Sequence, residues 1–72
     1  VNLENANLIK ADFKGANLTG ANLKNTNLED AELNNANLTD ADLTNAKMKN
    51  ANINNAILCR TKMPWGEENG GC

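Results

Sequence analysis

Two cysteines are the side chains in this 72-residue chain with the clearest capacity for chemistry. Cys59 and Cys72 enclose a loop of about a dozen residues, and a disulfide of that span stabilises a fold by about 3 kcal/mol in the chain-entropy model. Such a bridge would place the chain in an oxidising compartment. The alternative is a pair of free thiols in a reducing cytosol.

The remaining inventory argues against catalysis and against a bound cofactor. The sequence contains no His, Ser or Tyr, so the usual bases and orienting groups are missing and neither thiol has a partner to activate it. Two thiols alone would also leave a zinc site incomplete, because such a site usually needs four ligands. We therefore expect no enzyme activity, no metal site and no cofactor.

A five-residue phrase, A-(N/D)-L-x-x, organises almost the whole chain. Every fifth residue is large and apolar at thirteen consecutive positions, and the residue two places before each is small, Ala at ten of the thirteen. The expected core positions are Leu3, Leu8, Phe13, Leu18, Leu23, Leu28, Leu33, Leu38, Leu43, Met48, Ile53, Leu58 and Met63. Neither a helix nor a flat strand gathers residues of this spacing on one face. A chain that turns through about a right angle in each phrase does so, which predicts a solenoid with each phrase as one side of a square.

These phrases resemble the pentapeptide-repeat family over residues 1–65. The resemblance implies an all-β fold, a right-handed quadrilateral β-helix of about three coils in which four phrases make one coil. The ending Leu58-Cys59-Arg60-Thr61, with Met63-Pro64 and a late cysteine, resembles members from cyanobacteria and from plant thylakoid lumens. Function is not implied by the fold, because the family has diverse roles.

Two outward columns follow from this register. Gly, Asn or Asp fills ten of thirteen places two residues after the large one, with Lys10, Arg60 and Trp65 as exceptions, and these residue types mark corners because they tolerate left-handed dihedral angles. Asn and Asp before each large residue are expected to point outward, where they can bond successive turns. Stacking at twenty residues pairs opposite charges at Glu4–Lys24, Lys10–Asp30, Glu29–Lys49, Asp40–Arg60 and Asp42–Lys62, and like charges at Asp12 and Glu32.

The repeat ends near Pro64, which divides the chain into a β-helix at 1–65 and a carboxyl-terminal tail or cap at 66–72. Pro64 suits a last edge because it lacks a backbone donor, and Trp65 is expected to lie over the open end of the interior. Ile57 and Cys59 occupy outward positions, where a returning tail would cover both, so we favour the Cys59–Cys72 disulfide. It would indicate a thylakoid lumen or periplasm, with the cytoplasm as the alternative.

Charge and hydropathy narrow the function without naming it. The net charge of −2, with both signs dispersed, favours neither nucleic-acid binding nor dense DNA mimicry, and no apolar run is long enough for membrane insertion. We expect a noncatalytic structural or protein-interaction module with an unknown protein partner. The alternatives are a DNA-mimicking topoisomerase-binding protein, which the family resemblance suggests, and a redox-responsive lumenal element. Because the first coil has no coil below it to cover its backbone groups and apolar cross-section, we expect further coils or a cap upstream, or end-to-end self-association.

Overall fold

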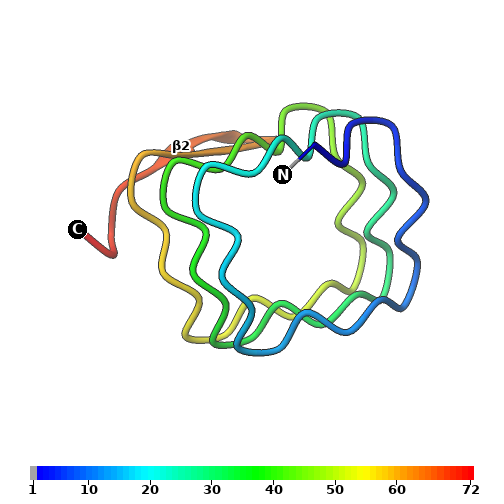
Figure 1. Cartoon of the computed structure of the whole chain (residues 1–72), viewed down its shortest axis with the longest axis horizontal. Helices are drawn as coiled ribbons and strands as arrows, with labels where there is room; N and C mark the ends of the chain where they lie inside the picture. The colour runs from blue at the N-terminus through cyan, green and yellow to red at the C-terminus, as the bar shows by residue number, and fades with distance from the viewer. Residues whose placement is uncertain (1) are drawn as a thin grey trace.

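The computed structural model describes residues 2–72, so Val1, the first small residue of the repeat, lies outside the described part. Strands β1 (Thr61–Met63) and β2 (Gly66–Glu68) pair in an antiparallel hairpin near the carboxyl terminus. The rest of the chain winds through short turns around a common interior, with successive coils side by side (Figure 1). Across residues 2–72, no helix is long and apolar enough to cross a membrane.

From Leu3 to Ala56, each five-residue phrase closes with a type II turn. In the first, the Ala6 amide donates to the Leu3 carbonyl at 3.0 Å, and Asn5, the third turn residue, has a φ of 66°. The same column has positive φ at Gly15 and Gly20 and at every later corner through position 60. The expected corners are therefore confirmed. Lys10 (φ 61°) adopts the turn although its side chain does not favour it, and Arg60 (φ 50°) has the same left-handed backbone at a bend that no hydrogen bond from the Thr61 amide to the Leu58 carbonyl closes.

Successive coils are joined by parallel β-bridges at an offset of twenty residues. These bridges join Asn2 to Asn22, Asn7 to Asn27, Asp12 to Glu32, Asn17 to Asn37, Asn22 to Asp42, Asn27 to Lys47, Glu32 to Asn52, Asn37 to Ile57 and Asp42 to Lys62. The amide of Leu23, for example, donates to the Asp42 carbonyl one coil on, at 2.7 Å. Bridges of this regularity make the chain a β-helix solenoid, and they confirm the twenty-residue stacking.

The large residues of the repeat point into the interior, but their burial depends on the coil. In the middle of the solenoid Leu23, Leu28, Leu33, Leu38 and Leu43 are 0% exposed. Leu18 (6%) and Met63 (3%) are also buried, whereas the other six expected core residues are partly exposed and pack against this cluster; they are Leu3, Leu8, Phe13, Met48, Ile53 and Leu58. A solenoid buries a coil fully only between two neighbours, so the first and last coils are less covered.

Two threonines replace alanine in the inward column and are fully buried with their hydroxyl groups paired. The Thr26 hydroxyl donates to the Leu23 carbonyl at 2.8 Å, and the Thr61 hydroxyl donates to the Leu38 carbonyl at 2.7 Å. A buried hydroxyl is tolerated when it is hydrogen-bonded. Both substitutions therefore fit the core without leaving an unpaired group.

The outward Asn and Asp side chains bond the turns of their own phrases. Their Oδ1 atoms accept from the backbone amide two residues later in the same phrase, as Asn37 does from Thr39 at 3.1 Å. The residues with this bond are Asn2, Asn7, Asp12, Asn17, Asn22, Asn27, Asn37, Asp42 and Asn52. A short side chain reaches its own turn more easily than the next coil. Asn22 is the one in this set that also reaches across, donating to Glu4 at 3.3 Å.

Most of the ion pairs expected from the stacking of charged residues do not form. Of the five expected opposite-charge pairs, Asp40–Arg60 forms an ion pair, with 2.7 Å between Asp40 Oδ1 and Arg60 Nε, and the other four do not among the described residues. An unexpected pair links Lys14 to Glu32 at 4.0 Å and sets a cation beside the Asp12–Glu32 column. Exposed pairs gain little from fixing two long side chains, so their register is weakly enforced.

Candidate functional site

The carboxyl-terminal end contains the chain's one covalent cross-link. Cys59 and Cys72 form a disulfide, and their Cα atoms are 4.9 Å apart. Cys59 is 7% exposed, whereas Cys72 is exposed at the end of the tail. The bridge therefore ties the final residues to the outer face of the last coil, which carries Ile57 at 42% exposure.

The tail provides hydrogen-bond partners that the next coil would provide elsewhere. In the preceding coil the Asp40 amide donates to the Cys59 carbonyl at 2.9 Å. At the equivalent position in the last coil, the Arg60 amide donates instead to the Asn69 side-chain oxygen at 2.8 Å. The Gly71 amide donates to the Leu58 carbonyl at 3.0 Å. Residues 69–72 thus cover part of the last coil's edge, and we call this segment the latch.

The latch is close enough to the coil to require glycine at one position. A Cβ atom on Gly71 would lie 2.8 Å from the Leu58 nitrogen and 3.2 Å from Ile57 Cγ2, whereas one on Gly70 would meet nothing within 4 Å. Real Cβ atoms do not approach backbone atoms to less than 3.0 Å, so a side chain at Gly71 would displace the latch. Neither Asn69 nor Gly71 occupies a repeat position, so the sequence pattern carries no signal for their roles.

The hairpin places the expected cap residues differently from the sequence expectation. Pro64 and Trp65 form its turn, and Trp65 is 59% exposed, with its indole N–H donating to Glu68 Oε2 at 2.7 Å. The indole is therefore largely in solvent rather than buried over the open interior. Strand β2 pairs with β1, so the expected division at 65/66 falls inside a hairpin and residues 66–68 are part of the ordered fold.

Two carboxylates near this end have pKa values below the usual range. The hydrogen bond from Arg60 lowers the pKa of Asp40, and its charge adds to the effect. The same contact raises the pKa of Arg60. The hydroxyl group of Thr44 donates to Asp42 and lowers the pKa of that carboxyl, with smaller contributions from the charges of Lys62 and Lys24. These side chains are stabilised as charged groups at neutral pH.

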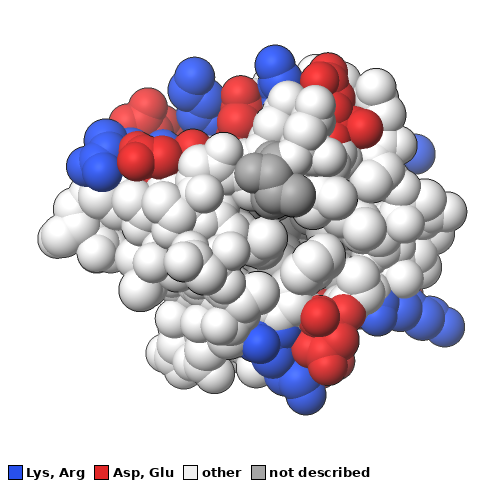
Figure 2. All heavy atoms as spheres, in the orientation of Figure 1, with Lys and Arg blue, Asp and Glu red and all other residues white. Residues whose placement is uncertain are grey.

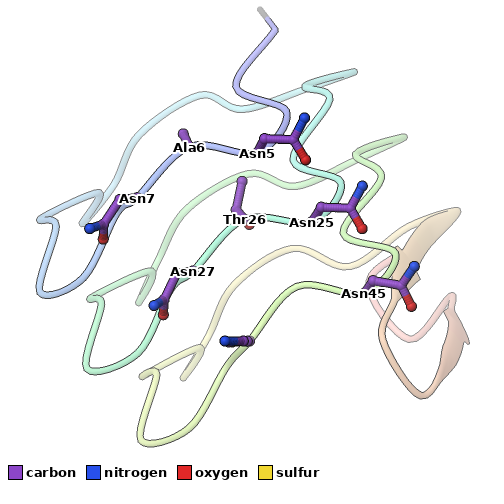
Figure 3. Close-up of a pocket in the computed structure, with 8 residues that line it drawn as sticks. Asn5, Ala6, Asn7, Asn25, Thr26, Asn27 and Asn45 are labelled. Carbon is purple, nitrogen blue, oxygen red and sulfur yellow. The ribbon is translucent and has the colours of Figure 1, made fainter.

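A second candidate site lies on the side of the solenoid, in a hollow of about 390 Å³. It is lined by two columns of outward side chains and the small residues between them, and we call it the amide trough: Asn5, Ala6, Asn7, Asn25, Thr26, Asn27, Asn45 and Lys47 (Figure 3). The sequence identified some of these residues as corners but gave no indication of a hollow between the columns. The trough offers carboxamides and one ammonium group, which bind ligands by hydrogen bonds rather than by covalent chemistry.

The surface charge is mixed. Figure 2 shows Lys and Arg side chains interspersed with Asp and Glu along opposite edges of the visible face, with uncharged surface between them. The whole chain has seven basic and nine acidic residues. Within residues 2–72, no group of three or more His, Cys, Asp or Glu is placed to hold a metal ion.

Comparison with known proteins places this geometry in a family. The sequence model of the family described as pentapeptide repeats (8 copies) matches residues 1–35 and 26–63. A pentapeptide repeat protein from the Arabidopsis thaliana thylakoid lumen is similar in structure, with a TM-score of 0.79 and 29% identity over 85% of this chain and 43% of that one. No curated protein sequence matches.

Two cyanobacterial structures are similar in sequence but superpose less well. A pentapeptide repeat protein from Cyanothece is 44% identical over 76% of this chain and 34% of that one, with a TM-score of 0.38. HetL, a pentapeptide repeat protein involved in heterocyst differentiation regulation in Nostoc, is 29% identical over 90% of this chain and 35% of that one, with a TM-score of 0.39. The chain spans less than half the length of each of the three proteins. The family match over most of the chain, with the repeated turns and the bridges at twenty residues, shows that it belongs to the pentapeptide-repeat family.

Proposed function

We propose that the chain is a noncatalytic structural or protein-interaction module, built as a right-handed, four-sided β-helix of about three coils. The observation that carries the proposal is the fixed orientation of the outward side chains. Bridges at an offset of twenty residues align these side chains in columns, and in nine phrases a backbone amide donates to the Asn or Asp side-chain oxygen and holds it in place. Binding to a rigid surface loses little conformational entropy, so such columns suit recognition of a protein partner.

Site-specific photocrosslinking in extract of the source organism tests this function. A crosslinker at outward Asn37 and another at Asn27 would report two different faces of the solenoid. We expect at least one face to yield a discrete adduct that excess unlabelled protein suppresses. Equal, non-competable labelling from both faces would contradict a specific interaction role.

A redox-responsive role is the second candidate, and the latch is the observation that favours it. A thiolate from a dithiol reductant would attack the exposed Cys72 sulfur, break the bond to Cys59 and form a mixed disulfide. The second thiol of the reductant would then displace Cys72, leaving two protein thiols and an oxidised reductant. The latch would lose its covalent tie to the last coil.

The reduction potential separates a structural bridge from a regulatory one. Equilibration with dithiol buffers of known potential, followed by alkylation and mass spectrometry, measures it directly. A value below about −300 mV marks a structural bridge that cellular thiols leave intact. A higher value, near that of the compartment, would support the redox-responsive role.

We also propose an oxidising compartment, a thylakoid lumen or a periplasm, on the strength of the disulfide and the similarity to a thylakoid-lumen protein. Alkylation of the protein from its source without reductant tests this: protected cysteines support it, and two alkylated thiols favour the cytoplasm. The DNA-mimicking alternative has less support, because the net charge is −2 and acidic and basic groups are mixed.

End-to-end self-association is a further partner hypothesis. It is supported by Leu3, Leu8 and Phe13, which are only partly buried at the first coil. Stacking a second copy there would remove apolar surface from water. Sedimentation over a wide concentration range tests it, and a strict monomer at the highest concentration would contradict it.

A further inference from the structure

We propose that the amide trough binds an extended, acidic segment of a partner protein, with carboxylates placed along the Asn7, Asn27 and Lys47 column. This inference rests on the proposed interaction role and names a site and a partner chemistry for it. Figure 3 shows Asn7 and Asn27 on one side of the trough and Asn5, Asn25 and Asn45 on the other, with Ala6 and Thr26 between them.

The first column presents N–H donors because each Asn oxygen already accepts a hydrogen bond within its own phrase, which turns the amide nitrogen away from that bond. Asn7 Oδ1 accepts from the Ile9 amide and Asn27 Oδ1 from the Glu29 amide, each at 3.2 Å. Neither Nδ2 group donates to a described residue in return. The turn bond thus fixes each carboxamide with its two N–H donors free. An acceptor-only group, such as an ionised carboxylate, is the matching ligand.

Lys47 continues the column with a positive charge. Parallel bridges join Asn7 to Asn27 and Asn27 to Lys47, so the backbones at these three residues are one strand spacing apart, about 4.8 Å. Lys47 makes no ion pair within the described residues. Two oxygens of one carboxylate can accept from neighbours on adjacent coils, and such charge-assisted hydrogen bonds are stronger than neutral ones.

The opposite column suits the main chain of an extended peptide. The carboxamides of Asn5, Asn25 and Asn45 make no side-chain hydrogen bond to a described residue, so each retains both donors and acceptors. A peptide backbone alternates N–H and C=O groups along its length and can use both. One wall therefore matches acidic side chains while the other matches the backbone.

The equivalent columns around the solenoid lack this combination. The columns that begin at positions 10 and 12 contain the carboxylates of Asp12, Asp30 and Glu32, which would repel an acidic ligand. Positions 20 and 22 stack under Asp40 and Asp42, while those at 15 and 17 have no cation above them. The eight residues that line the amide trough include a lysine and no acid. With a net charge of −2 the whole molecule does not attract acids, so binding depends on these local donors and is sensitive to salt.

Titration of the isotope-labelled chain with an acetylated tetraglutamate amide, followed by NMR, tests the proposal. We expect shifts confined to residues 5–7, 25–27 and 45–47, with weaker binding of the tetraglutamine analogue. Asn27→Asp should weaken binding about tenfold, because it replaces two donors with a repelling oxygen. It should preserve the turn, since Asp42 already accepts the same bond from the Thr44 amide at 3.0 Å.

Asn52→Asp is the matched control, because it makes the same change in the same kind of turn outside the trough. It should leave binding unchanged. Equal binding by the Asn27→Asp variant, equal binding of tetraglutamine, shifts spread over the surface or no binding at all would each overturn the proposal. Competable crosslinks from Asn37 would then still support an interaction module, so the two failures are distinguishable.

Discussion

The middle coil and the carboxyl-terminal cap are held together in contrasting ways. In residues 21–40 each phrase repeats the same turn, the same bridge and the same fully buried leucine, so every contact has several equivalents. In residues 59–72 the disulfide, the Asn69 side-chain bond and the close fit of Gly71 each occur once. Damage to the coil should therefore spread through its neighbours, whereas damage to the cap should remain local.

The largest expected effect comes from placing a charge in the middle coil. Leu33 is 0% exposed, and Leu33→Asp would bury a carboxylate without a partner. We expect a loss of about 4 kcal/mol or more, enough to unfold the chain. Thermal melting by circular dichroism checks this. The control is Asn35→Asp, at an exposed corner where other phrases have Asp, and this variant should melt near the original temperature. An unchanged melting temperature for Leu33→Asp would show that the interior register is wrong.

Reduction of the disulfide is the next largest change and tests whether the cap fails locally. Loss of the Cys59–Cys72 bridge should lower the free energy of unfolding by about 2 to 4 kcal/mol in the chain-entropy model. Hydrogen exchange should accelerate first at Arg60 and Gly71, whose amides bond across the latch, and later at Leu33. Uniform acceleration across all coils would contradict the contrast between cap and coil.

A methyl group at Gly71 should loosen the latch without touching the bridge. Gly71→Ala places Cβ against the Leu58 nitrogen, and we expect a cost of about 1 to 3 kcal/mol, in the range for overpacking. Gly70→Ala is the matched control, because its Cβ would meet no atom within 4 Å. Denaturant unfolding of both variants checks the difference. If both lose the same stability, the close approach of the latch is not a real constraint.

Within the repeat, Lys10 marks a corner where the residue type does not suit the backbone. Its φ of 61° is in the left-handed region, so Lys10→Gly should stabilise the chain by about 1 kcal/mol. Asn25→Gly, at a corner with the same φ of 61°, should gain less because Asn already tolerates it. Paired denaturation curves measure both. A loss of stability in the Lys10 variant would mean that its side chain contributes more than its backbone costs.

The smallest effect is a dependence of stability on acid pH. The pKa values of Asp40 and Asp42 are lowered in the fold, so these carboxylates stabilise it above their unfolded pKa of about 4, and the contribution is lost as pH falls through the folded values. Both groups are at the surface, and we expect a modest decline below about pH 4 at low salt. Unfolding between pH 2 and 7 measures it. Arg60→Gln should reduce the part of this pH dependence that comes from Asp40. An unchanged pH profile in that variant would contradict the assignment of the lowered pKa to the Arg60 contact.

The interior and corner columns were predictable because they repeat. A large residue at every fifth position and Gly, Asn or Asp two residues later indicate the same local conformation many times over, so one irregular phrase cannot obscure the pattern. Even Lys10 and Arg60 take the corner conformation that the neighbouring phrases impose. The sequence did not indicate how outward side chains share hydrogen bonds, because an Asn can reach either its own turn or the next coil.

Single contacts between distant segments were decided by the tertiary structure. Trp65 is exposed because β2 returns along β1 instead of leaving the chain end free to fold over the interior. Asn69 takes the place of a coil partner only because the latch brings it beside Arg60. The amide trough exists because residues 5–7, 25–27 and 45–47 are stacked, and a hollow between two columns has no signature within either one. By itself the sequence determined the local turn and its inward residues, since these depend on neighbours along the chain, whereas the cap and the trough depend on how those turns meet in space.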